Sequence, residues 1–418
     1  MKLLHAADLH IDSPLRGLSR YPGAPVDVFR GAAREALANL VDFALAEDVG
    51  ALLLAGDVYD GDWKDYRTGL YFTAQMQRLR DAGIRVYMVA GNHDAQSKIT
   101  KELRLPANVH RFSTARPETV EDHELGIAVH GQGFADRDIQ DNLAAEYPKA
   151  RDGYFNVGLL HTALQGAEGH DMYAPCRIED LTARGYDYWA LGHIHARTVV
   201  RAGDPWIVFP GNLQGRHARE TGPKGATLIT VGGADPEVRH HDLDAVRWEH
   251  LHVDVSGVSD DSGVLGLAEQ AMRGATRGAD GRPLAVRISF TGTSDAHELL
   301  WRDRERIDNE LRAAAIDMDS LWVERIRVAT SRVTADEDTA DTTALLGDLR
   351  RTASALGGDS AALEKLVRGL PGLRGTGGAV DGDGTGVDDP AWRSRVFDEA
   401  VDLLAAMLGG GARPGGDA

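Results

Sequence analysis

Cysteine is nearly missing from this sequence: Cys176 is the only one in 418 residues. One thiol cannot form an intrachain disulfide, so we expect a fold without cross-links in a reducing cytoplasm. Long apolar runs are also missing, and no segment approaches the roughly 18 residues that span a bilayer. Met1-Lys2-Leu3-Leu4 reaches His5 and Asp8 before a signal-peptide core of about 7–15 residues can form. These absences predict a protein with no part in a membrane.

Positive charge is scarce. The 46 Lys and Arg residues are outnumbered by 64 Asp and Glu residues, which gives a formal net charge of −18. This balance argues against a broad basic groove, because phosphate contacts to nucleic acids normally come from a basic surface. It does not exclude phosphate chemistry, since two bound divalent cations keep a positive excess after two carboxylate ligands have offset part of their charge. We expect phosphate contacts to be concentrated at such a site, with a partner supplying further affinity.

Short apolar runs recur through residues 1–245, each ending in polar, small or glycine positions. Such runs are typical of strands buried on both faces of a sheet. Helical patterns lie between the early runs, and strand-and-turn character follows over 206–243. The expected strands cover 3–7, 51–55, 85–90, 156–160 and 188–191, and the expected helices cover about 27–47, 65–82 and 178–184. The alternation predicts a layered α/β domain over residues 1–245.

The pattern changes near residue 248. Alternating strands at 251–255 and 285–290 flank an alanine-rich helical segment, and a helical pattern at 296–315 precedes a third strand at 321–328. This order predicts a second, smaller α/β domain over residues 248–332.

Residues 334–418 form an acidic, glycine-rich tail, with 16 glycines and 15 acidic against 8 basic residues. Its middle, 375–388, has the composition of a flexible tether. Asp389 and Pro390 then predict an N-cap and a first helical position. An apolar stripe follows over 390–408: Trp392, Val396, Ala400, Leu403, Leu404 and Met407. This helix either folds back onto the first domain or docks on a partner helix, and the long tether favours docking.

Five polar blocks follow directly on, or end, the apolar runs of the first domain. In open α/β sheets, ligands gather at the carboxyl ends of strands. Each block alone is weak, because a Gly-Asp pair is a common turn and a lone histidine is more often structural. Five blocks in order predict one shared site, with glycines 56, 91 and 192 allowing sharp turns and close backbone approach. The blocks are Asp8-Leu9-His10, Gly56-Asp57-Val58-Tyr59-Asp60, Gly91-Asn92-His93-Asp94, His161 and Gly192-His193-Ile194-His195.

Carboxylates, imidazoles and one amide oxygen suit Mn, Fe, Zn or Mg better than a metal that prefers thiolates. Two ions about 3.5–4 Å apart can clamp the attacking and leaving oxygens of a displacement at phosphorus. The candidate ligands are Asp8, His10, Asp57, Asn92, His161, His193 and His195. Asp57, in the middle block, is the candidate for the bridging carboxylate. His93 is then left to face the phosphate as a transition-state stabiliser or general acid, oriented by Asp94 or Asp60.

At these blocks the sequence resembles the calcineurin-like metallophosphoesterase superfamily, whose pattern is D-x-H, G-D, G-N-H-[DE], H and G-H-x-H. The resemblance implies an α/β fold: a β-sandwich flanked by helices, with a smaller α/β capping domain and a tethered C-terminal helix. It also implies how the ligands divide. Metal one takes Asp8, His10, Asp57 and His195, and metal two takes Asp57, Asn92, His161 and His193.

Within the superfamily the sequence is most similar to the DNA-repair nuclease branch, especially its bacterial YhaO-like and SbcD-like members. The similarity lies in residues 5–14, 56–61 and 210–217. It implies a DNA exonuclease, or an endonuclease, that uses manganese and works with a coiled-coil ATPase of the SbcC-like or YhaN-like kind. It also implies a capping domain that binds DNA, and a homodimer. Some branch members have a second active-site histidine three residues after the bridging aspartate, where this chain has Asp60, so the role of Asp60 stays open.

Arg216 and His217 follow a Pro-Gly turn late in the first domain. One hypothesis is that both contact the substrate phosphate; a salt bridge in a surface loop is the alternative.

Three other functions compete with a DNA nuclease. A small-molecule phosphoesterase, such as a cyclic-nucleotide phosphodiesterase, shares the metal motifs but needs neither the second domain nor the tethered helix. Protein phosphatases have an Arg-Gly pair after the aspartate three residues beyond the bridge, whereas Gly61-Asp62 follows Asp60 here. A non-catalytic scaffold would tolerate lost ligands, and every ligand position is filled.

Overall fold

The structure is a computed structural model, and the described residues are 1–13, 25–60, 66–95, 103–164, 173–233, 235–318, 320–333, 348, 351–353, 355–357, 359–369 and 389–409. They form two compact units, with the change from the first to the second after Arg247. The short segment His217–Thr221 belongs to the second unit. Within these ranges, no helix combines the length and the apolar character that a membrane crossing requires.

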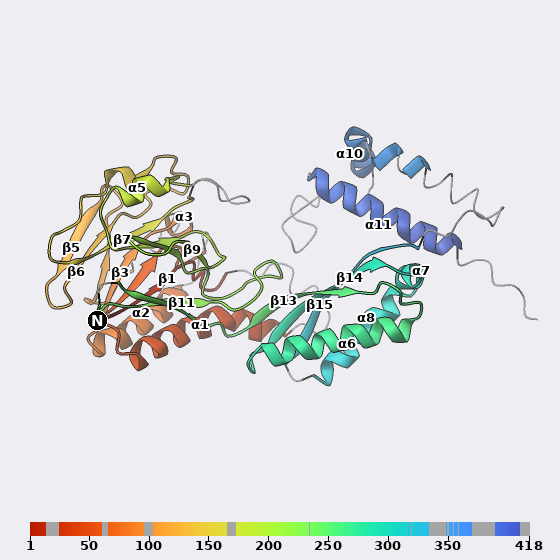
Figure 1. Ribbon diagram of the computed structural model, residues 1–418, viewed down its shortest axis with the longest axis horizontal. Coiled ribbons are helices and arrows are strands. Elements are labelled where there is room, and N and C mark those ends of the chain that lie inside the picture. The colour runs from red at the N-terminus through yellow and green to blue at the C-terminus, as the bar shows by residue number, and fades with distance from the viewer. Residues whose placement is uncertain are drawn as a thin grey trace, which may run out of the picture. The chain divides into compact units, whose positions relative to one another are not determined.

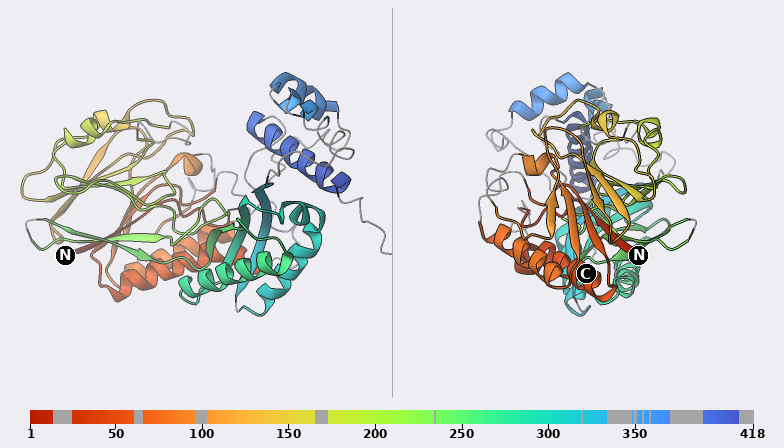
Figure 2. Two further views of the ribbon diagram at one scale, coloured as in Figure 1. Left: turned by 45° about the vertical axis from the view of Figure 1, so that its right-hand side comes forward. Right: turned by 90° about the vertical axis from the view of Figure 1, so that its left-hand side faces the viewer.

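The first unit contains two six-stranded sheets that pack face to face (Figures 1 and 2). One sheet has the order β12-β11-β1-β2-β3-β4. Strands β1 to β4 pair parallel with one another, and β11 pairs antiparallel with both β1 and β12. Its strands are β1 (Lys2–Ala6), β2 (Ala51–Ala55), β3 (Arg85–Val89), β4 (Val109–Arg111), β11 (Gly225–Thr230) and β12 (Glu237–Asp242).

The other sheet has the order β5-β6-β7-β8-β10-β9, with parallel pairing from β6 to β10. Its strands are β5 (Glu118–Asp122), β6 (Ile127–Gly131), β7 (Phe155–His161), β8 (Tyr188–Gly192), β9 (Thr198–Arg201) and β10 (Trp206–Phe209). Alternate residues such as Leu53 and Val157 meet in the core between the sheets, whereas Leu52 and Leu54 face the helices.

Helices cover the outer faces of this sandwich. Leu37 and Leu40 of α1 and Phe72 of α2 pack on the first sheet. The helices of the unit are α1 (Val26–Ala46), α2 (Tyr66–Asp81), α3 (Asn92–Ala95), the 3-10 helix η2 (Leu143–Glu146) and α5 (Ile178–Thr182). The predicted β-sandwich flanked by helices is confirmed.

The second unit has a three-stranded sheet in the order β13-β14-β15, with β14 and β15 parallel. Its strands are β13 (Arg247–Asp254), β14 (Leu284–Thr293) and β15 (Leu321–Ser331). The helices α6 (Asp261–Gly278), α7 (His297–Arg302) and α8 (Arg304–Ile316) follow the strands in the predicted order. The single helix expected over 296–315 is two helices, because the chain leaves helical geometry at Asp303.

Two C-terminal helices, α10 (Ser360–Gly369) and α11 (Pro390–Gly409), belong to the second unit. Helix α11 contacts α10 and α7, so the described parts of the predicted third region pack with the small domain. The stripe predicted on this helix is buried at Trp392, whereas Leu403 and Leu404 are 40% and 49% exposed. Helix α10 was not predicted from the sequence. The tether predicted at 375–388 lies outside the described residues.

Candidate metal centre

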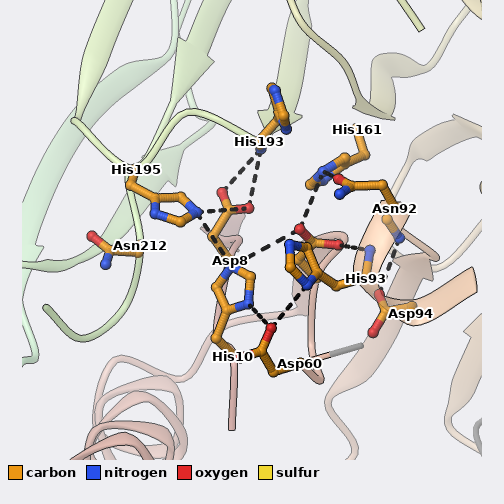
Figure 3. A network of polar contacts seen from close by, with 12 residues as sticks. Asp8, His10, Asp60, Asn92, His93, Asp94, His161, His193, His195 and Asn212 are labelled. Atoms are coloured by element: carbon orange, nitrogen blue, oxygen red, sulfur yellow. Dashed lines mark hydrogen bonds and ion pairs between the residues drawn. The ribbon is translucent and has the colours of Figure 1, made fainter. Parts of the chain in front are cut away.

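Strands from both sheets of the first unit end at one edge. β1, β2 and β3 are parallel neighbours, and β7 pairs with β8 so that His161 is level with Gly192. Each of these strands runs into one of the five polar blocks. The structure therefore brings the ligand atoms of Asp8, Asp57, His10, His161 and His195 close to one another. The ring of His193, in contrast, is directed away from the Asp8 carboxylate (Figure 3).

The backbone that presents these side chains has an unusual conformation. Asp8, His10, Asp57 and His193 have φ angles of 52°, 43°, 51° and 108°, in or near the left-handed region that side chains other than glycine rarely adopt. Residues held in this way persist only where the surrounding structure fixes them, and they concentrate at functional sites. Here, backbone hydrogen bonds of 3.1 Å from Asp8 N to Gly56 O and of 3.0 Å from His10 N to Asp57 O fix the first two loops.

The glycines of the blocks serve two needs. Gly56 has a φ of 91°, as expected for a sharp turn. No left-handed φ occurs at Gly91 or Gly192, which are needed for space instead: an added Cβ would lie 2.2 Å from Asp57 Oδ1 and 1.9 Å from Ala55 O, respectively.

One group of ligand atoms comes from Asp8, His10 and His195. Nε2 of His10 lies 3.2 Å from Nε2 of His195, which is 3.9 Å from Asp8 Oδ1. Oδ2 of Asp57 is 3.9 Å from the same His10 nitrogen. These are the residues implied for metal one.

A second group surrounds His161. Its Nδ1 donates to the Ala55 carbonyl at 2.9 Å, which leaves the Nε2 lone pair facing inward. That Nε2 lies 2.9 Å from Asn92 Oδ1 and 3.5 Å from Asp57 Oδ2. Oδ2 of Asp57 thus faces both groups, as the bridging assignment requires, while its Oδ1 accepts from His93 N at 2.9 Å.

His193 joins the cluster differently. Its backbone N–H donates to both Asp8 carboxylate oxygens, at 3.0 and 3.2 Å. Its ring lies edge-on to the His161 ring, with the centroids 5.3 Å apart. The residue therefore fixes Asp8 through its backbone and keeps its imidazole beside the second group.

The chemistry of these donors fits a pair of divalent cations. Burial lowers the pKa of His161 to about 3 and that of His10 well below its usual value, so both imidazoles are neutral, as ligation requires. Burial raises the pKa of Asp57, and burial together with the charge of Asp57 raises that of Asp94 to about 7. Buried lone pairs and carboxylates that face one another need positive charge between them.

His93 lies at the solvent side of the cluster with its side chain 32% exposed, whereas Asp8 and His10 are completely buried. Nδ1 of His93 is 2.8 Å from Asp60 Oδ1. Burial lowers the pKa of His93, but the hydrogen bond to Asp60 and the charge of Asp57 outweigh it, so the net shift is upward. Asp60 also accepts from Ser13 Oγ at 2.7 Å and lies 3.7 Å from Nδ1 of His10.

The two acidic candidates behind His93 differ in their contacts. Asp60 binds the imidazole, whereas Asp94 accepts from the backbone N–H groups of Gly91, Val58 and Tyr59 at 3.0–3.2 Å. Asp94 therefore connects two of the ligand loops, which is a different role from the predicted orientation of His93.

Arg216 and His217 are consecutive residues, but their side chains make different contacts. Nη2 of Arg216 donates to Nδ1 of His195 at 3.2 Å, which places its guanidinium beside the cluster. His217 belongs to the second unit, and its ring lies 3.6 Å from Glu220 Oε1.

Several neighbours of the cluster were missed from the sequence. Nζ of Lys224 donates to the His195 carbonyl, and the rings of Phe134 and Tyr173 contact His161 and His193 edge-on. Nothing in their local sequence marks them, because they reach the cluster through the sandwich topology alone. Asn212 lies in the segment 210–217, whose similarity to the nuclease branch is noted above. It is buried, and its backbone N–H donates to the same His195 carbonyl.

The family models agree with this geometry. Residues 1–197 match the calcineurin-like phosphoesterase model, and residues 248–331 match the middle domain of metallophosphoesterase YhaO. The first match defines a class of phosphoester hydrolases whose fold holds a dinuclear metal site.

Among curated proteins, the chain is 36% identical over 297 residues to the uncharacterized metallophosphoesterase YhaO of Bacillus subtilis, covering 70% of this chain and 72% of that protein. The chain belongs to the YhaO-like family of calcineurin-like metallophosphoesterases.

More distant similarity extends to a DNA repair protein and to a nuclease. The DNA double-strand break repair protein Mre11 of Sulfurisphaera tokodaii is 25% identical over 60% of this chain, and the match covers 64% of that protein. A component of the nuclease SbcCD of Rhodobacter capsulatus is 35% identical over 138 residues, which are 33% of this chain and 30% of that protein.

Proposed function

We propose that this protein is a metal-dependent DNA nuclease that hydrolyses phosphodiester bonds in DNA repair, acting as an exonuclease or an endonuclease. The observation that carries this proposal is the pairing of His93 with Asp60 at the exposed side of the group of predicted ligand side chains. The similarity to the DNA repair protein Mre11 and to the nuclease SbcCD supports DNA as the substrate. The single cysteine supports action in the cytoplasm.

Two divalent ions, for which we propose manganese, would supply a nucleophilic hydroxide and hold the phosphate oxygens. Asp8, His10, Asp57 and His195 would hold one ion, and Asp57, Asn92, His161 and His193 the other.

Among the chain's own side chains, His93 is the proposed proton donor. Asp60 accepts a hydrogen bond from Nδ1–H of His93. In the charged imidazole, Nε2 also carries a proton, which can be given to the substrate. From there it stabilises charge on the phosphate and protonates the leaving oxygen. Arg216, whose guanidinium lies beside His195, is the proposed further contact to the phosphate. His217 is retained as a weaker candidate, since its described contact is with Glu220.

The test compares substrates and variants in one assay. Purified wild type, His93→Ala and Asp57→Asn are incubated with Mn²⁺ and either end-labelled DNA or a cyclic nucleotide. His110→Ala is the matched control, because His110 is a half-exposed imidazole of the same unit that pairs with Glu118. We expect DNA cleavage by wild type and by the control, and little by the other two variants.

Three results would overturn the assignment. Robust hydrolysis of the cyclic nucleotide with intact DNA would favour the small-molecule phosphodiesterase. Activity of His93→Ala equal to wild type would show that the measured cleavage comes from another site, and inactivity of every preparation on both substrates would favour the scaffold.

We also propose that α11 docks on a coiled-coil ATPase. Its buried Trp392 anchors the helix within the second unit, while Leu403 and Leu404 remain exposed for a partner. Leu403→Asp with Leu404→Asp should abolish co-purification with the ATPase and leave metal-dependent cleavage unchanged. Leu70→Asp changes an exposed leucine on α2 and is the control. Unchanged co-purification of the double variant would remove α11 from the interface.

A further inference from the structure

The three-stranded sheet of the second unit has one apolar and one polar face. Val286, Ile288 and Phe290 of β14 belong to the core with α6 and α8. Because side chains alternate along a strand, Arg287 and Ser289 point to the opposite face. Helix α11 lies on that opposite side of the sheet, away from α6 and α8 (Figures 1 and 2).

A pocket of about 570 Å³ opens on this polar face. Three segments build it: the strands, the segment His217–Thr221 and helix α11. Its lining is Ala218, Arg219, Thr221, Glu249, His250, His252, Arg287, Arg327 and Arg395. The rings of His250 and His252 lie side by side with centroids 4.1 Å apart, and His250 Nε2 is 2.8 Å from Ser289 Oγ.

Positive charge is concentrated in this pocket although the chain as a whole carries −18. Four arginines line it against one glutamate. The charge of Arg287 is offset by Glu324, since Nε of Arg287 lies 2.8 Å from Oε2 of Glu324 and both side chains are about 95% buried. Arg395 also lies 4.0 Å from Glu399 on the same helix. Counted together with Glu249, Glu324 and Glu399, the four arginines leave a formal charge of +1 (4 − 3).

We propose that this pocket binds a discrete phosphate group, carried by a small molecule of nucleotide size. Guanidinium groups match the geometry of phosphate oxygens, and imidazole N–H groups add further donors. A volume of about 570 Å³ lies within the range of small-ligand sites. The charges come from three segments around one hollow, which suits a compact anion better than the extended backbone of a duplex. The inference concerns the second unit alone and stands even if the proposed nuclease function fails.

The pocket also couples a ligand to the C-terminal helix. Arg395 is on α11, whereas Arg327 is on β15, so a phosphate bound by both would tie α11 to the sheet. The ligand would thereby control the helix that we propose as the partner-binding element.

The test uses inorganic pyrophosphate and the metal-free full chain in isothermal titration calorimetry. We expect saturable binding by wild type, and binding weaker by roughly tenfold or more in both Arg327→Ala and Arg395→Ala, because each loses a charge-assisted hydrogen bond. One control should bind like wild type: Arg273→Ala removes an exposed arginine of α6. Arg216→Ala is included as a reporter of any anion that is held beside the metal centre instead. Unchanged melting temperatures would show that the variants fold.

Hydrogen exchange gives a second measurement. Pyrophosphate should slow amide exchange over residues 390–402 in wild type and leave it unchanged in Arg327→Ala. Absence of saturable pyrophosphate binding, equal binding by both pocket variants, or binding of a short DNA duplex without pyrophosphate binding would each overturn the proposal. Loss of binding in Arg216→Ala alone would assign the anion to the metal centre and would overturn it as well.

Discussion

Each unit of this protein buries charge, and the Arg287–Glu324 pair of the second unit differs from the metal centre of the first in how that charge is balanced. In the second unit, Arg287 and Glu324 neutralise each other within hydrogen-bonding distance. In the first unit, Asp8 and Asp57 lie among the neutral imidazoles of His10 and His161. The two charges of a buried ion pair neutralise each other, whereas a buried cluster of lone pairs and carboxylates is neutralised only when it binds cations. Burial of charge therefore distinguishes a structural site from a functional one only when the balance of charge is counted.

The largest expected effect is on catalysis at the first site. Asp57→Asn should lower metal-dependent cleavage by about a thousandfold, which is roughly 4 kcal/mol of transition-state stabilisation. The melting temperature of the metal-free variant should stay equal to or rise above that of wild type, because a buried charge is removed and Asn can still accept from His93 N. Steady-state kinetics and calorimetry measure the two effects. A clear fall in the metal-free melting temperature would mean that Asp57 is structural.

The reverse pattern is expected in the second unit. Glu324→Gln should destabilise the protein by about 3–4 kcal/mol, because Arg287 then keeps a buried charge without its counter-charge. Denaturant unfolding measures the loss, and cleavage per folded molecule should be unchanged. Glu269→Gln, which breaks the exposed pair with Arg273, should cost less than about 1 kcal/mol. Equal losses of stability in the two variants would show that the buried pair contributes no more to the free energy of unfolding than the exposed pair.

Acid should weaken the first unit through a buried histidine outside the metal cluster. Burial lowers the pKa of His130 to about 4, and its ring bonds Thr119 and Asn156. Between pH 6.5 and 4 the unfolded state binds the proton and the folded state does not. The free energy of unfolding therefore decreases by about 3 kcal/mol as the pH is lowered from 6.5 to 4. His130→Gln should flatten this part of the stability profile measured by denaturant unfolding. A profile as steep as that of wild type would contradict the assignment.

The smallest effect, counted per site, is that of metal loading on stability. Mn²⁺ at about 100 times its dissociation constant should raise the free energy of unfolding by about 2.7 kcal/mol per site. Asp57→Asn should show little of this gain, whereas Glu324→Gln should show all of it. Thermal scans with Mn²⁺ and with a chelator measure the difference. A gain shared equally by both variants would place the ions elsewhere in the molecule.

How much the sequence could predict depended on the length scale of the signal. The strands leading to Asp8, Asp57 and His161 were predicted because apolar runs and polar ends are local signals. Strand β5 was missed, since Glu118–Asp122 is largely polar and only pairing with β6 makes it a strand. The break at Asp303 was also missed, because it interrupts a continuous helical pattern.

The site shows the same limit. The ligand set was readable from residue types and spacing. The choice between Asp60 and Asp94 as the partner of His93 was not, because each is an aspartate within a polar block at a strand end. The local sequence gives no sign of contacts that are made across the sandwich, such as that of Lys224 with His195. Residues that act through tertiary neighbours become visible only in three dimensions.

The left-handed backbone at Asp8, His10, Asp57 and His193 has a consequence for the timing of metal loading. Each such residue costs on the order of 1 kcal/mol, and the folded chain meets this cost through packing and hydrogen bonds before any ion arrives. Ions therefore enter a receptacle that is already shaped, and loading needs little rearrangement of the loops. The protein should take up its metals after folding is complete and release them without unfolding.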